Sequence, residues 1–353
     1  MGIKGLNSFI NSITGKIAGI EEVHLSMFSG QTIAFDFTNQ LYRFLYRNND
    51  QNSYILEFIN LIHKFQKYKI NLIFVFDGKP IDEKQYVIEH RKAYREKLIK
   101  KIDEMTENSD SSDEYADTIK HLSKKTNCIK ISYILECKKL FDILGIAYIH
   151  IEYIEADPIF RYLLDNKFAD ACFSGDMDVV AYGCHTILNS LDYRKDIVHI
   201  IKYDLLLEEL GVSSEEFLYT CILSGTDYNN SLKRSKFEIN LKLIKKYKTI
   251  EGIMNNLEEI NNPLPDEYKK GFPKRFDWEN TFALFNEDIS SDVEIHIGAS
   301  IIYFQNNKLK KTKKTINKIQ EYINNNIINI DKDWKYIRKF TEFLKLKYDI
   351  ELR

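Results

Sequence analysis

The sequence predicts an α/β fold built on a central, mostly parallel, twisted sheet flanked by helices. Residues 32–37 and 71–76 have the β-branched and aromatic content of buried strands, and residues 55–68 between them carry apolar side chains at helical spacing. A helix that connects two buried strands is the βαβ unit from which parallel sheets are assembled. Acidic residues follow these strands, and the carboxyl ends of strands are where open α/β sheets bind ligands.

Composition limits the classes of partner. The chain has 353 residues, 29% of them charged, and a formal net charge of −2, so a nucleic-acid partner would need local basic patches. Its five cysteines have no CxxC spacing, which predicts free, buried thiols in a reducing, intracellular compartment, without zinc or disulfides. No apolar run approaches the roughly 18 residues of a membrane span, and residues 1–10 lack the apolar core of a signal peptide, so no membrane partner is expected.

The first two strands each lead to an aspartate. Asp36 lies at the end of the first, before a helical segment, and Asp77 opens the Asp-Gly-Lys-Pro turn after the second. Neighbouring parallel strands end at the same edge, so these two carboxylates are expected side by side. An aspartate in this place is often only a helix cap, and that alternative stays open for each residue alone.

The next segment changes charge along its length. Residues 82–101 are helical in pattern and basic, with Lys84 and Arg91 two turns apart on one face. Such a charge run is usually a solvated face, but here it follows the acidic turn and can project over it to contact phosphates. Residues 103–117 contain seven acids and no Lys or Arg, which predicts a disordered internal linker.

Two further acidic pairs follow strands. Helical periodicity resumes near Ile119, is strongest over 134–144 and stops at Gly145; a strand at 147–151 then precedes Glu155 and Asp157. Another at 168–174 precedes Asp176 and Asp178. Carboxylates this close repel each other unless a cation lies between them, and hard oxygens favour Mg²⁺ or Mn²⁺. The alternative for a lone pair is a solvated acidic loop.

The remaining elements are shorter. Strands at 186–190 and 197–202 are joined by a turn at 192–195, and a helix at 214–223 ends before a Gly-Thr-Asp turn that holds Asp227. Further helices are expected at 241–247, 250–257 and 334–353, with a basic cluster at 308–318.

Six blocks in this order resemble the XPG-type structure-specific 5′ nucleases, the family of flap endonuclease and of the 5′→3′ mismatch-repair exonuclease. They are MGIKGL at the start, AFDF with Tyr42 following, FVFDGKP, the Glu155–Asp157 block, GDMDVVAYG and CILSGTDY, and the match extends to about Gly271. YIEADPIFRYL, CILSG and LPDEYKKGF are more similar to the exonuclease branch, as is the lack of a PCNA-binding box. The asparagine-rich composition is compatible with a viral member.

The resemblance implies a PIN-like 5′-nuclease fold with a helical arch and a C-terminal helical region. It implies an N-terminal nuclease region at 1–102, an arch or cap region at 103–146, an internal nuclease region at 147–232 and a helical, DNA-binding C-terminal region at 233–353, with one catalytic domain overall. It also implies two Mg²⁺ ions, which Mn²⁺ can replace, over the scissile phosphate. Asp36, Asp77, Glu155 and Asp157 would hold the first ion, and Asp176, Asp178 and Asp227 the second.

Basic and aromatic residues fall at the family's DNA-contacting positions. Lys84 and Arg91 would neutralise phosphate charge in the transition state. Tyr42 would stack on an unpaired base, although a core tyrosine beside Phe44 is the open alternative. The full set of implied DNA contacts is Gly2, Lys4, Tyr42, Lys84, Arg91, Arg95, Lys233, Arg234 and Lys236.

Two features depart from the family. The Gly-Ile-Gly hairpin that grips duplex DNA, often with K⁺, is replaced by Arg234-Ser235-Lys236, so duplex anchoring and the K⁺ site are not supported, while the basic side chains can still meet phosphates. The acidic segment 103–117 lies where the family has its arch and is expected to loop outward, away from DNA.

The leading hypothesis is therefore a monomeric Mg²⁺-dependent 5′→3′ exonuclease or flap endonuclease. Its DNA would be a 5′ flap, a recessed 5′ end, or a nicked or branched duplex, in replication, repair or recombination. It would act in the nucleus or, for a viral member, at a cytoplasmic replication site. One alternative is a catalytically weak or inactive scaffold that binds DNA junctions. Another is a metal-dependent phosphohydrolase using Asp176 and Asp178, which leaves Glu155, Asp157 and Asp227 unexplained.

Overall fold

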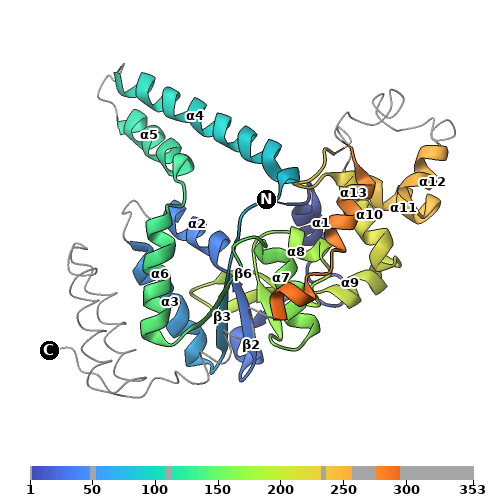
Figure 1. Cartoon of the computed structure of the whole chain (residues 1–353), viewed down its shortest axis with the longest axis horizontal. Coiled ribbons are helices and arrows are strands. Elements are labelled where there is room, and N and C mark those ends of the chain that lie inside the picture. Colours follow the sequence, from blue (N-terminus) through green and yellow to red (C-terminus); the bar gives the residue numbers. More distant parts are fainter. Residues whose placement is uncertain (1, 48–52, 108–112, 232–235, 257–275, 295–353) are drawn as a thin grey trace.

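A seven-stranded mixed sheet forms the centre of the molecule in the computed structural model, which describes residues 2–47, 53–107, 113–231, 236–256 and 276–294 (Figure 1). The strand order is β1-β7-β6-β5-β2-β3-β4. The strands are β1 (Ile20–His24), β2 (Thr32–Asp36), β3 (Asn71–Phe76), β4 (Ala147–His150), β5 (Ala171–Phe173), β6 (Thr186–Asp192) and β7 (Ile197–Lys202). Pairing is parallel from β6 through β5, β2 and β3 to β4, and antiparallel where β7 joins β6 and β1. The predicted mostly parallel sheet is confirmed.

Alternate side chains of the strands supply two separate cores. Ile33 and Phe35 point to one face and Ala34 to the other, as the two-residue repeat of a strand requires. The first face is covered by α2 (Phe37–Arg47), α3 (Ser53–Lys67) and α6 (Ile131–Leu144). The second face is covered by α1 (Leu6–Ile13), α7 (Ala156–Asp165), α8 (Asp178–Ala181), α9 (Tyr203–Leu210) and α10 (Ser214–Ser224), and α11 (Phe237–Tyr247), α12 (Ile250–Asn255) and α13 (Trp278–Phe285) extend it.

Phenylalanines dominate the first core. Phe35 stacks on Phe173 with ring centroids 4.6 Å apart, and Phe74 stacks on Phe141 at 4.4 Å. These pairs tie β2 to β5 and β3 to α6, and aromatic pairs of this kind contribute beyond their buried area. The strands that end in acidic residues are thus held rigidly by the core beneath them.

The acidic segment 103–117 is not a disordered linker in its described parts. Helix α4 (Gln85–Glu107), preceded by a short 3₁₀ turn (Asp82–Lys84), continues through residues 103–107, and α5 (Asp113–Thr126) contains 113–117; residues 108–112 lie outside the described part. The two helices form a hairpin that projects from the body, with residues 103–107 and 113–117 near its far tip (Figure 1). The prediction failed because packing between two helices supports a polar sequence.

Other expectations differ in smaller ways. β5 is shorter than the predicted 168–174, and α11 begins four residues before the predicted 241. The sequence analysis did not predict α1, β1, α7, α9 or α13. Cys128 is exposed, so the expectation of buried thiols is wrong there, while the other four cysteines are buried and all five are free. In the described residues no helix combines the length and apolarity needed to cross a bilayer. The predicted basic cluster at 308–318 and helix at 334–353 lie outside the described residues.

Candidate functional site

The carboxyl ends of the central strands bring acidic residues together. Asp36 is the last residue of β2 and pairs in register with Val75 of β3, so Asp77 lies beside it. Asp36 accepts hydrogen bonds from the Asn39 amide at 2.8 Å and the Ser174 hydroxyl at 2.7 Å. The first of these caps α2, so the helix-cap alternative is correct for Asp36, and its second oxygen faces the end of β5. Ser174 Oγ also accepts the Asp176 amide at 3.0 Å, which links the ends of β2 and β5.

The loop after β3 brings the second acidic pair to the same edge. The amide of Gly78 donates to the Ile154 carbonyl at 2.9 Å, and a Cβ on Gly78 would lie only 2.6 Å from that oxygen. Only glycine allows this close approach. Asp77 Oδ1 then accepts the amide of Ala156 at 2.9 Å, where Glu155 is the N-cap of α7. Asp157 follows in the first turn of that helix.

Asp227 reaches the cluster from a separate turn. It follows α10, whose start is a capping box of Ser213 and Glu216. The turn is held by Thr226, whose hydroxyl donates to Asn229 Oδ1 at 2.7 Å, and by Asn229 Nδ2, which donates to the Ile222 carbonyl at 2.9 Å. The structure therefore brings together all seven acids: Asp36, Asp77, Glu155, Asp157, Asp176, Asp178 and Asp227.

Burial and mutual repulsion disfavour negative charge in this cluster. Burial, with added repulsion from Asp77, raises the pKa of Asp36 to about 7. Burial and the neighbouring Asp176 also raise the pKa values of Asp157 and Asp178 well above their usual range. Both side-chain oxygens of Asp178 are buried without a hydrogen-bond partner. A buried carboxylate without a partner is costly, and no protein group offsets that cost at Asp178 by a hydrogen bond in the described residues.

The donor set fits a hard divalent cation. All seven side chains offer carboxylate oxygens, the ligands that Mg²⁺ prefers. Within the described ranges, no three or more His, Cys, Asp or Glu side chains are arranged so that they could hold a metal ion as they stand. The acids are instead coupled through their electrostatic fields, and the unpartnered Asp178 carboxylate is the strongest sign of a group that an ion would complete.

Two cationic side chains face the acids: Lys84 in the 3₁₀ turn and Arg91 on α4. Lys84 Nζ forms an ion pair with Glu155 at 2.9 Å and lies 5.0 Å from the Tyr228 ring centroid. Burial alone would lower the pKa of Lys84, but Glu155, Asp178 and Asp157 raise it well above its ordinary value, so the ammonium stays charged. Arg91 Nη2 contacts Asp227 at 2.7 Å, with 43% of its side chain exposed. The base of the hairpin thus supplies positive charge at the edge of the cluster.

The amino-terminal segment packs directly against the second acidic pair. Gly2 has φ +85°, and a Cβ there would collide with Asp176 Oδ1 and lie 2.8 Å from Asp178 Oδ1. Lys4 is anchored nearby, with its amide donating to the Gly225 carbonyl at 3.1 Å and Nζ to Ser231 at 3.0 Å. Glycine at position 2 therefore allows the terminus to lie on the acids.

Gly2→Ala is expected to lower DNA cleavage by roughly 10²-fold, because a 1 Å misplacement of reacting groups costs about this much. The added methyl must displace either the terminus or Asp176. Gly15→Ala is the matched control, since Gly15 also has positive φ (+69°) but no atom within 4 Å of an added Cβ. Single-turnover rates at saturating enzyme check this, and equal losses in both variants would contradict a specific contact with the acids.

Metal affinity and stability are expected to change with pH in opposite directions. Because the folded pKa of Asp36 is about 7 and its ordinary value is 3.8, the folded state holds a proton that the unfolded state has lost between these values. The metal-free protein should therefore lose stability as pH rises through this window, and Mg²⁺ should stabilise it more strongly at the upper end, where fewer protons compete. Thermal unfolding in EDTA and in millimolar Mg²⁺, from about pH 5 to about pH 8, measures both trends. A stabilisation by Mg²⁺ that is equal at both ends would contradict the assignment.

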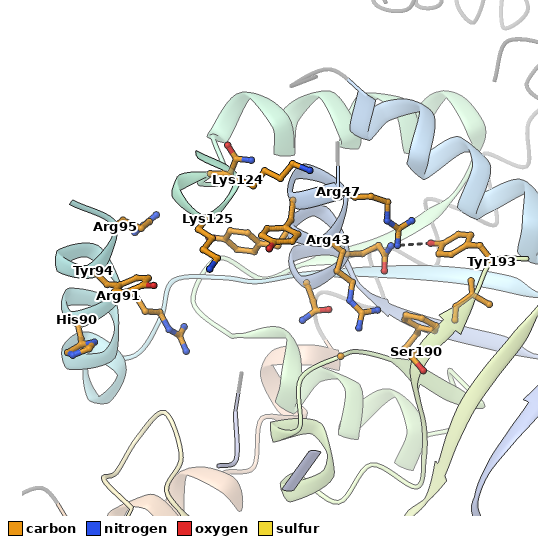
Figure 2. Close-up of a pocket in the computed structure, with 18 residues that line it drawn as sticks. Arg43, Arg47, His90, Arg91, Tyr94, Arg95, Lys124, Lys125, Ser190 and Tyr193 are labelled. Atoms are coloured by element: carbon orange, nitrogen blue, oxygen red, sulfur yellow. Dashed lines mark hydrogen bonds between the residues drawn. The ribbon is translucent and has the colours of Figure 1, made fainter. Parts of the chain in front are cut away.

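A large cavity adjoins the acids beneath the hairpin (Figure 2). Its volume is about 1130 Å³, and α2, α4, α5 and the end of β6 line it. Tyr42, Arg91 and Arg95, three of the expected DNA contacts, belong to its lining. Tyr42 is 37% exposed, so the alternative of a core tyrosine is wrong. Of the other expected contacts, Lys236 is exposed at the start of α11, while Lys233 and Arg234 lie outside the described residues.

Three kinds of residue at the site escaped the sequence analysis. Ser174 connects Asp36 to Asp176 through its hydroxyl. The Tyr228 hydroxyl lies 3.4 Å from Glu155 Oε2 and forms a hydrogen bond with the Tyr182 hydroxyl at 2.8 Å. Arg43 packs behind the cluster on α2. Tyr228 is the last residue of the CILSGTDY block and Ser174 directly precedes the GDMDVVAYG block, so the sequence offered a signal for both. Nothing in the local pattern distinguished Arg43.

Comparison with known proteins agrees with this geometry. Residues 1–98 match the model of the XPG N-terminal domain, and residues 145–227 match the model of the XPG I-region. The chain is 28% identical over 283 residues to flap endonuclease 1-A of Oryza sativa subsp. japonica, covering 76% of this chain and 72% of the relative.

Solved structures show the same fold. The catalytic core of Rad2 in complex with a DNA substrate superposes with a TM-score of 0.63 and 19% identity, over 97% of this chain and 99% of that one. The Holliday junction-resolving enzyme GEN1, in complex with product DNA and Mg²⁺, superposes with a TM-score of 0.63 and 15% identity, over 98% of this chain and 79% of that one.

Proposed function

Because the chain belongs to the XPG and flap endonuclease family of structure-specific 5′ nucleases, we propose that its seven clustered acids hold two Mg²⁺ ions for the hydrolysis of DNA phosphodiesters. The substrates are 5′ flaps, recessed 5′ ends, and nicked or branched duplexes, and the enzyme acts as a monomer in replication, repair or recombination. The observation that carries the proposal is the buried Asp178 carboxylate, with both oxygens unpartnered, among six other acids at one sheet edge.

The seven acids would form two sets of metal ligands. Asp36, Asp77, Glu155 and Asp157 would hold one ion, and Asp176, Asp178 and Asp227 the other, with Mn²⁺ able to replace Mg²⁺. When bound, the ions supply a water of lowered pKa and positive charge beside the attacked phosphate. Lys84 and Arg91, which contact Glu155 and Asp227 in the structure, would turn to the phosphate oxygens and neutralise the charge that develops there.

DNA contacts extend from the cluster in two directions. Tyr42 offers an exposed ring to an unpaired base, and Arg95 contributes charge from α4. Gly2 and Lys4, at the amino terminus of the protein, would lie against the DNA strand. On the other side, Lys236 precedes α11, where it would meet duplex phosphates, together with Lys233 and Arg234. Without the glycines of the hairpin between α10 and α11, we propose no K⁺ site. The enzyme would work in the reducing intracellular compartment that holds its DNA, the nucleus or a viral replication site.

The direct test is incubation with Mg²⁺ of a labelled 5′-flap duplex and a duplex with a recessed 5′ end. We expect cleavage of at least one, loss of cleavage in EDTA, and product lengths that report endonucleolytic or exonucleolytic action. Binding without cleavage of either would favour an inactive scaffold. Hydrolysis of a small phosphomonoester that Asp176→Asn abolishes would favour the phosphohydrolase.

A further inference from the structure

A lysine and a histidine outside the acidic cluster meet behind Asp77. Nζ of Lys138, on α6, lies 2.6 Å from Nδ1 of His150, the last residue of β4. Both side chains are partly buried, and Lys138 Nζ also lies 5.2 Å from the ring centroid of Phe76, the last residue of β3. His150 pairs in register with Phe76, so the next residue of the chain, Asp77, lies beside this contact. The pair therefore joins α6 to the strand end from which Asp77 leaves the sheet.

The imidazole of His150 extends this contact to the backbone of Asp77. Burial and the neighbouring Lys138 lower the pKa of His150, so the ring is neutral at neutral pH. A hydrogen bond with the Asp77 backbone acts in the opposite direction on this pKa, which identifies the ring as the donor and the Asp77 carbonyl as the acceptor. Because the ammonium of Lys138 can only donate, Nδ1 accepts from it, and the hydrogen of the neutral ring is on Nε2. Nε2 is therefore the atom that donates to Asp77.

The peptide group that follows Asp77 is held at both of its ends. Its N–H, which belongs to Gly78, donates to the Ile154 carbonyl at 2.9 Å, and its carbonyl accepts from His150. The carboxylate of Asp77 accepts the Ala156 amide at 2.9 Å. The orientation in which the Asp77 side chain leaves its backbone is thus fixed by hydrogen bonds on either side of the peptide plane.

A different contact already ties β4 to α6. The Tyr148 hydroxyl donates to Asp142 Oδ1 of α6 at 3.2 Å, two residues before His150 on the same strand. The contact of Lys138 with His150 differs from it because the imidazole passes the interaction on to Asp77. A histidine that is oriented through one ring nitrogen and supports a metal-binding residue through the other is a common device around metal sites.

We propose that Lys138 and His150 are positioning residues for Asp77. Lys138 fixes the tautomer and the orientation of the imidazole, and the imidazole fixes the peptide group that carries the Asp77 carboxylate toward the other acids. This rests on the proposed metal-dependent nuclease function and deepens it. Both residues lie outside the six sequence blocks that carry the family resemblance, so that resemblance did not predict them. Removing a group that supports a metal ligand in this way typically lowers metal affinity or activity by about 10- to 100-fold.

The test measures two quantities: the Mg²⁺ concentration for half-maximal cleavage of a 5′-flap duplex, and the rise in melting temperature that Mg²⁺ produces without DNA. H150L keeps an apolar side chain beside Phe76 but has no hydrogen-bonding atom, so its half-maximal Mg²⁺ concentration should rise by roughly tenfold or more. Its Mg²⁺-induced rise in melting temperature should shrink, because weaker binding stabilises less. K138M should shift both quantities in the same direction by a smaller factor. H150Q should recover part of the loss, since its amide nitrogen can donate to the Asp77 carbonyl in place of Nε2.

Y148F is the matched control. It removes a hydroxyl that also joins β4 to α6, but the contact it breaks is with Asp142 and does not involve Asp77. Both measured quantities should therefore stay at their wild-type values in Y148F. Equal losses in Y148F and H150L would show only a tie between the strand and the helix, and would overturn the proposal.

The order of the two residues gives a second criterion. Because Lys138 acts through His150, the double variant K138M/H150L should need no more Mg²⁺ than H150L alone, and additive losses would contradict this order. The melting temperature of each variant in EDTA reports its folding, and if H150L does not fold, K138M and H150Q decide the outcome. If the wild type cleaves neither a flap nor a recessed end, the proposed function fails, while the Mg²⁺-induced rise in melting temperature still tests the pair. If the wild type cleaves and the folded variants need the same Mg²⁺ concentration as it does, only the positioning role fails.

Discussion

Asp178→Asn is expected to slow single-turnover cleavage of a 5′-flap duplex by roughly 10³-fold or more while leaving DNA affinity nearly intact. Asp178 is 1% exposed, and its carboxylate has no hydrogen-bond partner in the described structure, so a cation is the group that it is built to meet. The amide of asparagine keeps the shape but removes the charge, and the loss should therefore fall on the chemical step.

The same substitution should stabilise the metal-free protein. It removes an uncompensated buried charge that Asp176 and Asp227 repel, so the melting temperature in EDTA should rise while stabilisation by Mg²⁺ shrinks. Asp204→Asn, at an exposed position on α9, is the control and should change neither quantity. A near-normal cleavage rate in Asp178→Asn, or a lower melting temperature in EDTA, would argue against a metal-binding role.

Lys84→Gln is expected to reduce the single-turnover rate by roughly 10²-fold, within the range for removing one group that stabilises transition-state charge. Lys84 has 12% of its side chain exposed and pairs with Glu155, so its ammonium lies at the cluster rather than in solvent. Lys84→Arg keeps the charge and should recover part of the rate.

A dependence on Mg²⁺ concentration separates the role of Lys84 from metal binding. Without the ammonium the acids lose a competing cation, so half-maximal activity of Lys84→Gln should need no more Mg²⁺ than the wild type. Lys92→Gln, at an exposed position on the same helix, should retain its rate. Comparable losses of rate in both variants would show that the effect comes from the overall positive charge of this segment and not from the position of Lys84 at the acids.

Local signals predicted the strands and helices where the pattern was strong. Residues 71–76 matched β3 residue for residue because a run of β-branched and aromatic side chains was bounded by Asp-Gly-Lys-Pro. The prediction of a disordered linker at 103–117 was wrong because this segment has few apolar residues, and the helices that contain its described parts, α4 and α5, are stabilised by packing on each other. Likewise α1 is a short helix whose stability comes from burying Leu6, Phe9 and Ile10 in the second core.

The sequence by itself determined which chemistry this protein carries: acids that follow strands, a basic helix after the Asp77 turn, and six ordered blocks that identified the family. Those features are local, so residue type and spacing in the sequence are enough to recognise them. Only the tertiary structure decided that Gly2 lies on Asp176 and Asp178, that Asp178 is left without a partner, and that Arg43 packs against Gly175. Each of these contacts joins residues that are remote in the chain or unremarkable in it, and burial, which sets the energy of a charge, exists only once the sheet and its two cores have formed.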